Sequence, residues 1–167
     1  MKLMIVPQKQ TRRKRDIEIG EVEKKLYLEF DDNGKAMAGD TETIINIYNG
    51  GFTKTDPEEV ALQVLNKGFI TAVGTDVYIT DISKIDVGTN SSSFIMKKVE
   101  DTGYLSFTSV SEKNKAICFD NVNEKIVIGM MADTTSSCLF ANAYYGKKNI
   151  LKSLLNIQVL SYFGLCL

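Results

Sequence analysis

Short strand-like segments, arranged in pairs around turn signals, constrain the fold of this chain more than any other feature. Segments 69–73 and 76–82 flank Gly74-Thr75, a two-residue connection with glycine first that is typical of a β-hairpin. Two further pairs follow, 93–99 with 104–110 and 115–119 with 125–130. Because consecutive hairpins build antiparallel sheets, this part of the chain predicts a mainly antiparallel β protein.

Other segments have the alternating or β-branched composition of strands. They are 2–6, 17–19, 26–30, 43–48 and 138–145. Pro7 has no backbone donor, so we expect the first segment to lie at a sheet edge. Asp31 and Asn33 resemble the opening of a calcium loop, but Lys35 stands where the next oxygen ligand should be, which favours a plain hairpin turn.

Two helices are expected beside the strands. Asp56 and Pro57 form a helix-start signal, Glu59 completes a capping-box spacing and Gly68 suits a C-cap, which together predict a helix over 57–67. Its buried stripe would be Val60, Ala61, Val64 and Leu65.

The C-terminal segment 149–167 has apolar residues at helical spacing, and three polar interruptions make it a poor transmembrane span. The expected fold is therefore an antiparallel β-sandwich or small barrel with the inserted helix and a C-terminal helix. An α+β two-layer arrangement, with both helices on one sheet face, is the alternative.

The charge distribution divides the chain. Residues 1–15 contain six basic residues and no acidic one, whereas 16–167 carry 14 basic and 21 acidic residues. All three arginines lie within 12–15, so the rest of the chain has no guanidinium with which to clamp a phosphate. We therefore expect a basic N-terminal arm (1–15) and one acidic, strand-rich domain (16–167) that ends in the hydrophobic segment 149–167.

The composition excludes several chemistries. The chain has no histidine, which removes imidazole-activated serine or cysteine nucleophiles and the commonest metal ligand. Cys118, Cys138 and Cys166 are too few and too far apart for a zinc cluster, and we expect free thiols in a reducing compartment. No glycine-rich phosphate loop is present, and no cofactor or metal is expected.

Three aspartates recur at a spacing of five residues, namely Asp76, Asp81 and Asp86. Carboxylates can serve glycoside hydrolysis or a hard metal ion, which leaves a histidine-free, carboxylate-dependent enzyme as one alternative. An odd spacing places neighbouring residues of a strand on opposite faces, so solvated or turn aspartates are the preferred interpretation.

These observations favour a non-enzymatic structural protein of an assembly, with a virion component of a tailed phage (capsid auxiliary, head-fibre or neck protein) as the most specific hypothesis. It would be made in the host cytoplasm and act in the virion, or otherwise remain cytoplasmic. Its partners would be other subunits, in a homo- or hetero-oligomer. The expected contact residues are Lys9, Arg12, Arg13, Lys14 and Arg15 of the arm, and Leu154, Leu155, Val159 and Phe163 of the C-terminal segment. A nucleic-acid-associated protein that uses residues 9–15 electrostatically is the second alternative.

Overall fold

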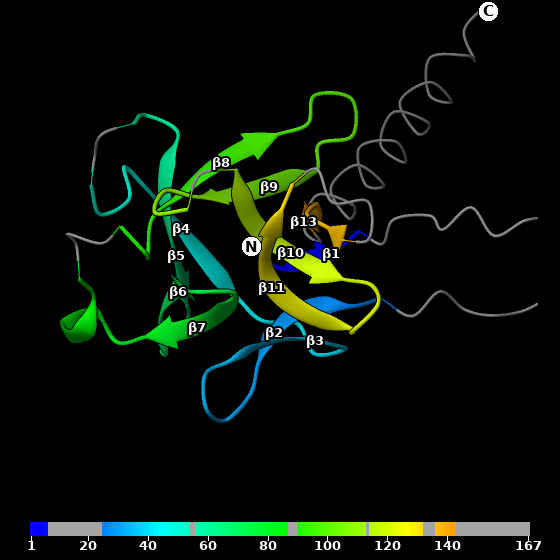
Figure 1. The fold of residues 1–167 in the computed structure, drawn as a ribbon, viewed down its shortest axis with the longest axis horizontal. Coiled ribbons are helices and arrows are strands. Elements are labelled where there is room, and N and C mark those ends of the chain that lie inside the picture. The colour runs from blue at the N-terminus through cyan, green and yellow to red at the C-terminus, as the bar shows by residue number, and fades with distance from the viewer. Residues whose placement is uncertain (7–24, 54–55, 87–89, 113, 132–135, 143–167) are drawn as a thin grey trace, which may run out of the picture.

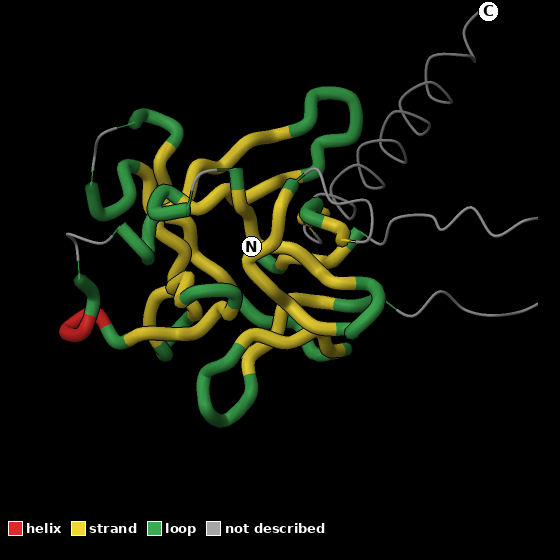
Figure 2. Tube along the Cα trace, in the orientation of Figure 1, coloured by secondary structure: helices red, strands yellow, loops and turns green. Residues whose placement is uncertain are grey.

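The computed structural model describes residues 1–6, 25–53, 56–86, 90–112, 114–131 and 136–142. Within these ranges the chain is mainly β and antiparallel, and its helical content is one short 3-10 turn, η1 (Ile82–Lys84) (Figures 1 and 2). The strands are β1 (Leu3–Ile5), β2 (Tyr27–Phe30), β3 (Ala36–Gly39), β4 (Ile45–Asn49), β5 (Glu59–Val64), β6 (Gly68–Val73), β7 (Asp76–Thr80), β8 (Phe94–Lys98), β9 (Leu105–Ser109), β10 (Lys115–Asp120), β11 (Lys125–Met130), β12 (Ser136–Ser137) and β13 (Phe140–Asn142). The predicted antiparallel β class is confirmed.

All thirteen strands belong to one sheet, which is not closed into a barrel. Nine of them form a continuous path in the order β3-β2-β1-β13-β9-β8-β5-β6-β7, and β4, β10, β11 and β12 branch from it. The two ends of the path approach each other where Lys35 bridges Tyr78 and where the Ile79 amide donates to the Gly34 carbonyl at 2.7 Å. The sheet therefore wraps around a common interior.

Strand β1 lies inside the sheet, between β2 and β13. The prediction that 2–6 would be an edge strand is wrong, because β13 arrives from far along the sequence and pairs with it. The first six residues of the predicted arm thus contribute to the sheet, and residues 7–15 lie outside the described ranges.

The main core is aromatic and aliphatic. Phe94, Phe107 and Phe140 are fully buried, and the rings of Phe107 and Phe140 lie 6.0 Å apart between centroids. Strand β10 is buried on both faces, since Ile117 and Phe119 face this core while Ala116 and Cys118 belong to a smaller apolar cluster. A strand covered on both sides has a continuous apolar sequence rather than an alternating one.

The helix predicted over 57–67 is wrong, because residues 59–64 of this range form β5, which pairs with β4 and β8. The signals at its start serve a turn instead: the Glu58 amide donates to the Asp56 carboxylate at 2.8 Å and the Glu59 amide to the Asp56 carbonyl at 3.0 Å. The following run, Val60 to Val64, is apolar enough to be buried on both faces, and periodicity does not distinguish such a strand from a buried helix.

The three predicted hairpins are all present as β6–β7, β8–β9 and β10–β11. The predicted C-terminal helix over 149–167 lies outside the described residues. Among the described residues there is no long apolar helix able to cross a membrane.

Candidate interaction surface

Strand β4 has one paired side and one open side. It pairs with β5, and the bonds at its two ends show which residues point toward that partner: the Leu65 amide donates to the Ile44 carbonyl at 3.1 Å and the Gly50 amide to the Glu59 carbonyl at 2.7 Å. In an antiparallel ladder alternate residues direct their backbone groups to alternate sides. The backbone N–H and C=O groups of the even-numbered β4 residues therefore point toward β5, and those of the odd-numbered residues point away from it.

The outward side is occupied at one end by the start of the chain. The Ile45 amide donates to the Met1 carbonyl at 2.8 Å, and the Met1 amino group donates back to the Ile45 carbonyl. Partial burial lowers the pKa of this amino group. Beyond it, the outward N–H and C=O groups of Ile47 and Asn49 have no strand partner in the part of the chain that the structure describes. We call these groups the β4 edge.

The side chains beside the β4 edge form an exposed apolar face. Ile44, Tyr48 and Leu65 are 41%, 49% and 42% exposed, and we call these three residues the outer face. Gln63 lies between them, and its side-chain oxygen accepts hydrogen bonds from the Tyr48 hydroxyl at 3.0 Å and from the Asn46 amide at 3.4 Å. These contacts orient the Tyr48 ring along the sheet surface.

An aromatic group flanks the outer face on the same side of the sheet, because Phe69 of β6 is paired with Gln63 of β5. The Tyr48 ring lies 6.0 Å from the ring of Phe69, which in turn meets Phe52 edge-on at 5.1 Å. Phe69 is buried, whereas Tyr48 beside it remains half exposed. Tyr48 is therefore held in place while it still offers a face and an edge to solvent.

The residues of β4 and β5 beside this surface carry no charge, and Glu59 at the start of β5 is buried. Residues 43–53 and 60–66 contain no Asp, Glu, Lys or Arg, although a quarter of the chain is charged. Native proteins usually protect an open strand edge with lysine, proline or a bulge, and β4 contains no lysine and no proline. This combination of an open edge and an exposed apolar face is typical of a surface that another chain covers.

A buried carboxylate fixes the loop that follows β4. Glu59 is fully buried and accepts hydrogen bonds from the Thr53 amide, at 2.9 Å, and from the Thr53 hydroxyl. The loop backbone passes so close that a Cβ atom on Gly51 would lie 2.3 Å from the Glu59 carboxylate. The Phe52 amide also donates to the buried Ser93 hydroxyl at 2.9 Å. The end of β4 is thus anchored to β5 and to the segment before β8.

The contact residues predicted from sequence lie outside the described ranges, so both groups remain predictions. They are Lys9, Arg12, Arg13, Lys14 and Arg15, and Leu154, Leu155, Val159 and Phe163. The sequence did predict a strand at 43–48, but a sequence does not reveal which side of a strand stays open. The absence of charge from 43–53 was the one signal that could have pointed to this surface.

The predicted carboxylate series has structural contacts. Asp76 pairs with Lys35 at 3.1 Å, and this hydrogen-bonded pairing raises the pKa of the lysine. Asp81 caps η1 by accepting from the Ser83 hydroxyl and amide, which lowers the pKa of its carboxyl group. The described residues contain no cluster of three acidic or sulfur ligands that could hold a metal ion.

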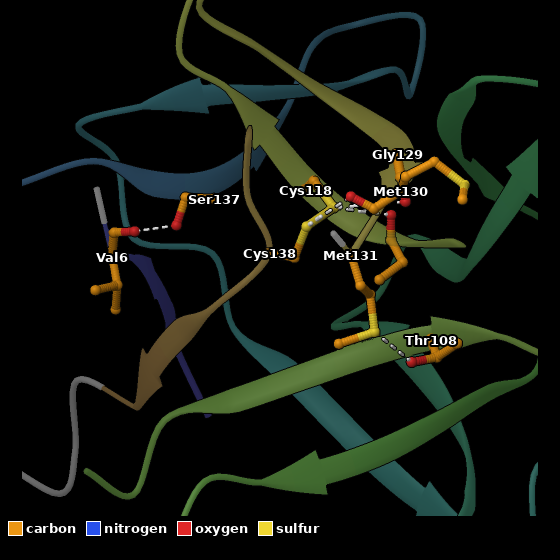
Figure 3. Close-up of a disulfide and its surroundings, with 9 residues drawn as sticks. Val6, Thr108, Cys118, Gly129, Met130, Met131, Ser137 and Cys138 are labelled. Carbon is orange, nitrogen blue, oxygen red and sulfur yellow. Dashed lines mark hydrogen bonds between the residues drawn. A yellow bond between two sulfur atoms is a disulfide. The ribbon is translucent and has the colours of Figure 1, made fainter. Parts of the chain in front are cut away.

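Cys118 and Cys138 form a disulfide between β10 and the segment that leads into β13 (Figure 3). The prediction of free thiols is therefore wrong for these two residues, and Cys166 lies outside the described ranges. The pair is distant in sequence, but the pairing of β12 with β10 brings the two residues together. Both side chains are buried beside the exposed Met130 and Met131.

The chain matches no known protein-family model and no curated protein. Among solved structures it is similar to a chain in the crystal structure of the Haemophilus ducreyi cytolethal distending toxin. The two are 10% identical, the match covers 76% of this chain and 87% of that chain, and the TM-score is 0.45. A likeness at this level implies no shared function.

Proposed function

We propose that this chain is a non-enzymatic assembly protein that binds other protein subunits through the β4 edge and the outer face. The observation that carries the proposal is the uncharged, open strand beside Ile44, Tyr48 and Leu65. Strand addition at such an edge supplies main-chain hydrogen bonds, and neighbouring apolar side chains add burial. The remainder of the described body, with its hairpins and closed core, acts as the rigid scaffold for this surface.

A virion component, such as a capsid auxiliary, head-fibre or neck protein of a tailed phage, is the most specific form of the proposal. The Cys118–Cys138 disulfide is compatible with it, because disulfides persist on virions and in other oxidising surroundings and are rare in the cytosol. In this form the chain is made in the host cytoplasm, and the disulfide closes once the particle leaves reducing conditions.

Light scattering on the purified full chain, followed by electron microscopy of particles from its source with labelled antibody, tests the proposal. We expect a concentration-dependent rise in mass and labelling of a larger particle. A chain that stays monomeric at every accessible concentration and is absent from every larger particle would show that the assembly function is wrong.

A second candidate function rests on the basic residues 9–15, which could bind nucleic acid electrostatically. The net acidic character of 16–167 opposes this function, because nucleic-acid-binding domains usually carry their basic surface on the fold itself. Gel-shift titrations at low salt, with and without neutralising substitutions in the arm, separate the two candidates.

A further inference from the structure

We propose that the partner at the β4 edge is a second copy of this chain, whose β4 pairs with the first antiparallel about a two-fold axis at Tyr48. This inference rests on the proposed function and names its partner. It joins the sheets of two copies into one continuous antiparallel sheet through an isologous contact.

The outward backbone groups of Ile47 and Asn49, which have no strand partner among the described residues, select the register. With the axis at Tyr48, Ile47 of each copy lies opposite Asn49 of the other, and the two pairs exchange four hydrogen bonds. An axis at Ile47 would instead place Asn49 opposite Ile45, whose outward groups already bond to Met1. The chain also turns away after Asn49, because Gly50 and Gly51 have φ angles of 91° and 49°. The register at Tyr48 therefore satisfies every outward group between the Met1 contact and this turn.

The same register brings the two Tyr48 side chains together. They would occupy a non-hydrogen-bonded position, where facing side chains come closest in an antiparallel pair. Because Tyr48 is held by Gln63 and Phe69, its ring is already oriented before the copies meet. Aromatic side chains facing each other in this way stabilise strand pairing.

Charge does not oppose a second copy at this surface. The full chain has a formal net charge of −1, so two copies repel each other only weakly overall. Residues 43–53 contain no charge, and their self-pairing places no like charges opposite each other. An uncharged edge equally offers no pattern for recognising an oppositely charged partner.

The short length of the open edge implies a weak contact. Stable interfaces usually bury at least about 1,200 Å² in total, and the open part of β4 spans only residues 47–49. We therefore expect a dimer that dissociates on dilution, and additional contacts within an assembly would strengthen it.

Sedimentation velocity on the full chain over a wide concentration series tests the inference. Tyr48→Lys places two ammonium groups opposite each other, and Asn49→Pro removes an outward N–H without touching a bond to β5. Each should weaken dimerisation about tenfold or more, with an unchanged circular dichroism spectrum. Val73→Lys is the matched control, since Val73 is an apolar residue of another strand with 55% exposure, and it should dimerise like the native chain.

Cysteine cross-linking in a Cys166→Ser background tests the register itself. Tyr48→Cys should form a disulfide between copies on mild oxidation, because the two residues would face each other. Asn46→Cys should not, because its two copies would be separated by four strand positions, roughly 13 Å. Equal cross-linking of both variants would overturn the register.

Self-pairing is wrong if the native chain is monomeric throughout, or if it dimerises unaffected by Tyr48→Lys and Asn49→Pro. A dimer that is unaffected by these two substitutions would show that the copies associate through another surface, and it would leave the assembly function standing. The assembly function fails only if the chain is monomeric at every accessible concentration and is also absent from every larger particle.

Discussion

The amide of Thr53 donates a 2.9 Å hydrogen bond to the carboxylate of Glu59, a fully buried side chain on the adjacent strand. The Thr53 hydroxyl contacts the same carboxylate, so one acidic group satisfies two donors of the loop that leaves β4. A buried carboxylate is costly unless it is hydrogen-bonded, which makes the two residues dependent on each other. This pair fixes where β4 ends, and hence how long its open edge is.

The first prediction tests this loop. Gly51→Ala should destabilise the fold by about 3 kcal/mol, because alanine is strained at a φ of 49° and its Cβ would displace the buried Glu59 carboxylate. Gly74→Ala is the control, since Gly74 has a φ of 62° and no atom within 4 Å of an added Cβ. Gly74→Ala should lower the free energy of unfolding by about 1 kcal/mol, because only the left-handed backbone conformation is unfavourable there. Equal losses in urea denaturation would show that the loop does not depend on the Glu59 contact.

The second prediction concerns the disulfide. Replacing both Cys118 and Cys138 with alanine should lower the free energy of unfolding by about 3 kcal/mol, since the bond closes a loop with a sequence separation of 20. Alkylation of the unfolded, unreduced protein followed by peptide mass spectrometry should label neither residue. Cys166→Ala should leave the Cys118–Cys138 peptide link intact. Labelling of both cysteines without a reductant would contradict the disulfide.

The third prediction concerns pH and the β10–β11 turn. The pKa of Asp120 lies below its ordinary value of 3.8, chiefly because the Asn123 side chain donates to its carboxylate, with the Asn123 and Val122 amides adding further bonds. A carboxyl group with a lowered folded pKa stabilises the fold above its unfolded pKa, and this stabilisation is lost as pH falls through the folded value.

Asp120→Asn should therefore lower the melting temperature at neutral pH and lose less stability than the native chain below about pH 4. Thermal denaturation at neutral and acidic pH measures both effects. Asp101→Asn, a substitution at an exposed turn of another hairpin, is the control and should follow the native pH profile. If Asp120→Asn also follows that profile, the turn bonds contribute nothing to the acid dependence.

The sequence predicted the hairpins well and the β5 strand badly, for a common physical reason. Hairpin turns are local, so the turns at Gly74 and after Asp120 can be predicted from a few neighbouring residues. Strand β5 is defined by pairing with β4 and β8, and its capping-type residues Asp56 and Glu59 serve equally well as turn and loop anchors. Tertiary pairing overrode the local helix preference.

The candidate interaction surface could not be predicted from the sequence, for a related reason. Whether the outward backbone groups of Ile47 have a partner depends on where Met1 and every other strand lie. A local sequence pattern does not contain this information. The Cys118–Cys138 bond depends likewise on the pairing of β12 with β10. Composition did exclude imidazole chemistry, because that conclusion needs no geometry.

The last prediction separates two contributions to association by their salt dependence. Exposed charge contacts are screened within about 8 Å at physiological ionic strength, so any contribution of Arg12, Arg13, Lys14 and Arg15 should fade as salt rises. Pairing at the β4 edge involves no charge and should persist. Neutralising the four basic residues with glutamine should therefore weaken association at low salt and leave it unchanged at high salt, whereas Asn49→Pro should weaken it at both.

Sedimentation velocity on both variants at low and at high salt measures these effects. If the glutamine variant associates like the native chain at low salt, the arm does not contribute to assembly; if Asn49→Pro loses its effect at high salt, the edge contact is not the uncharged strand pairing inferred from the structure.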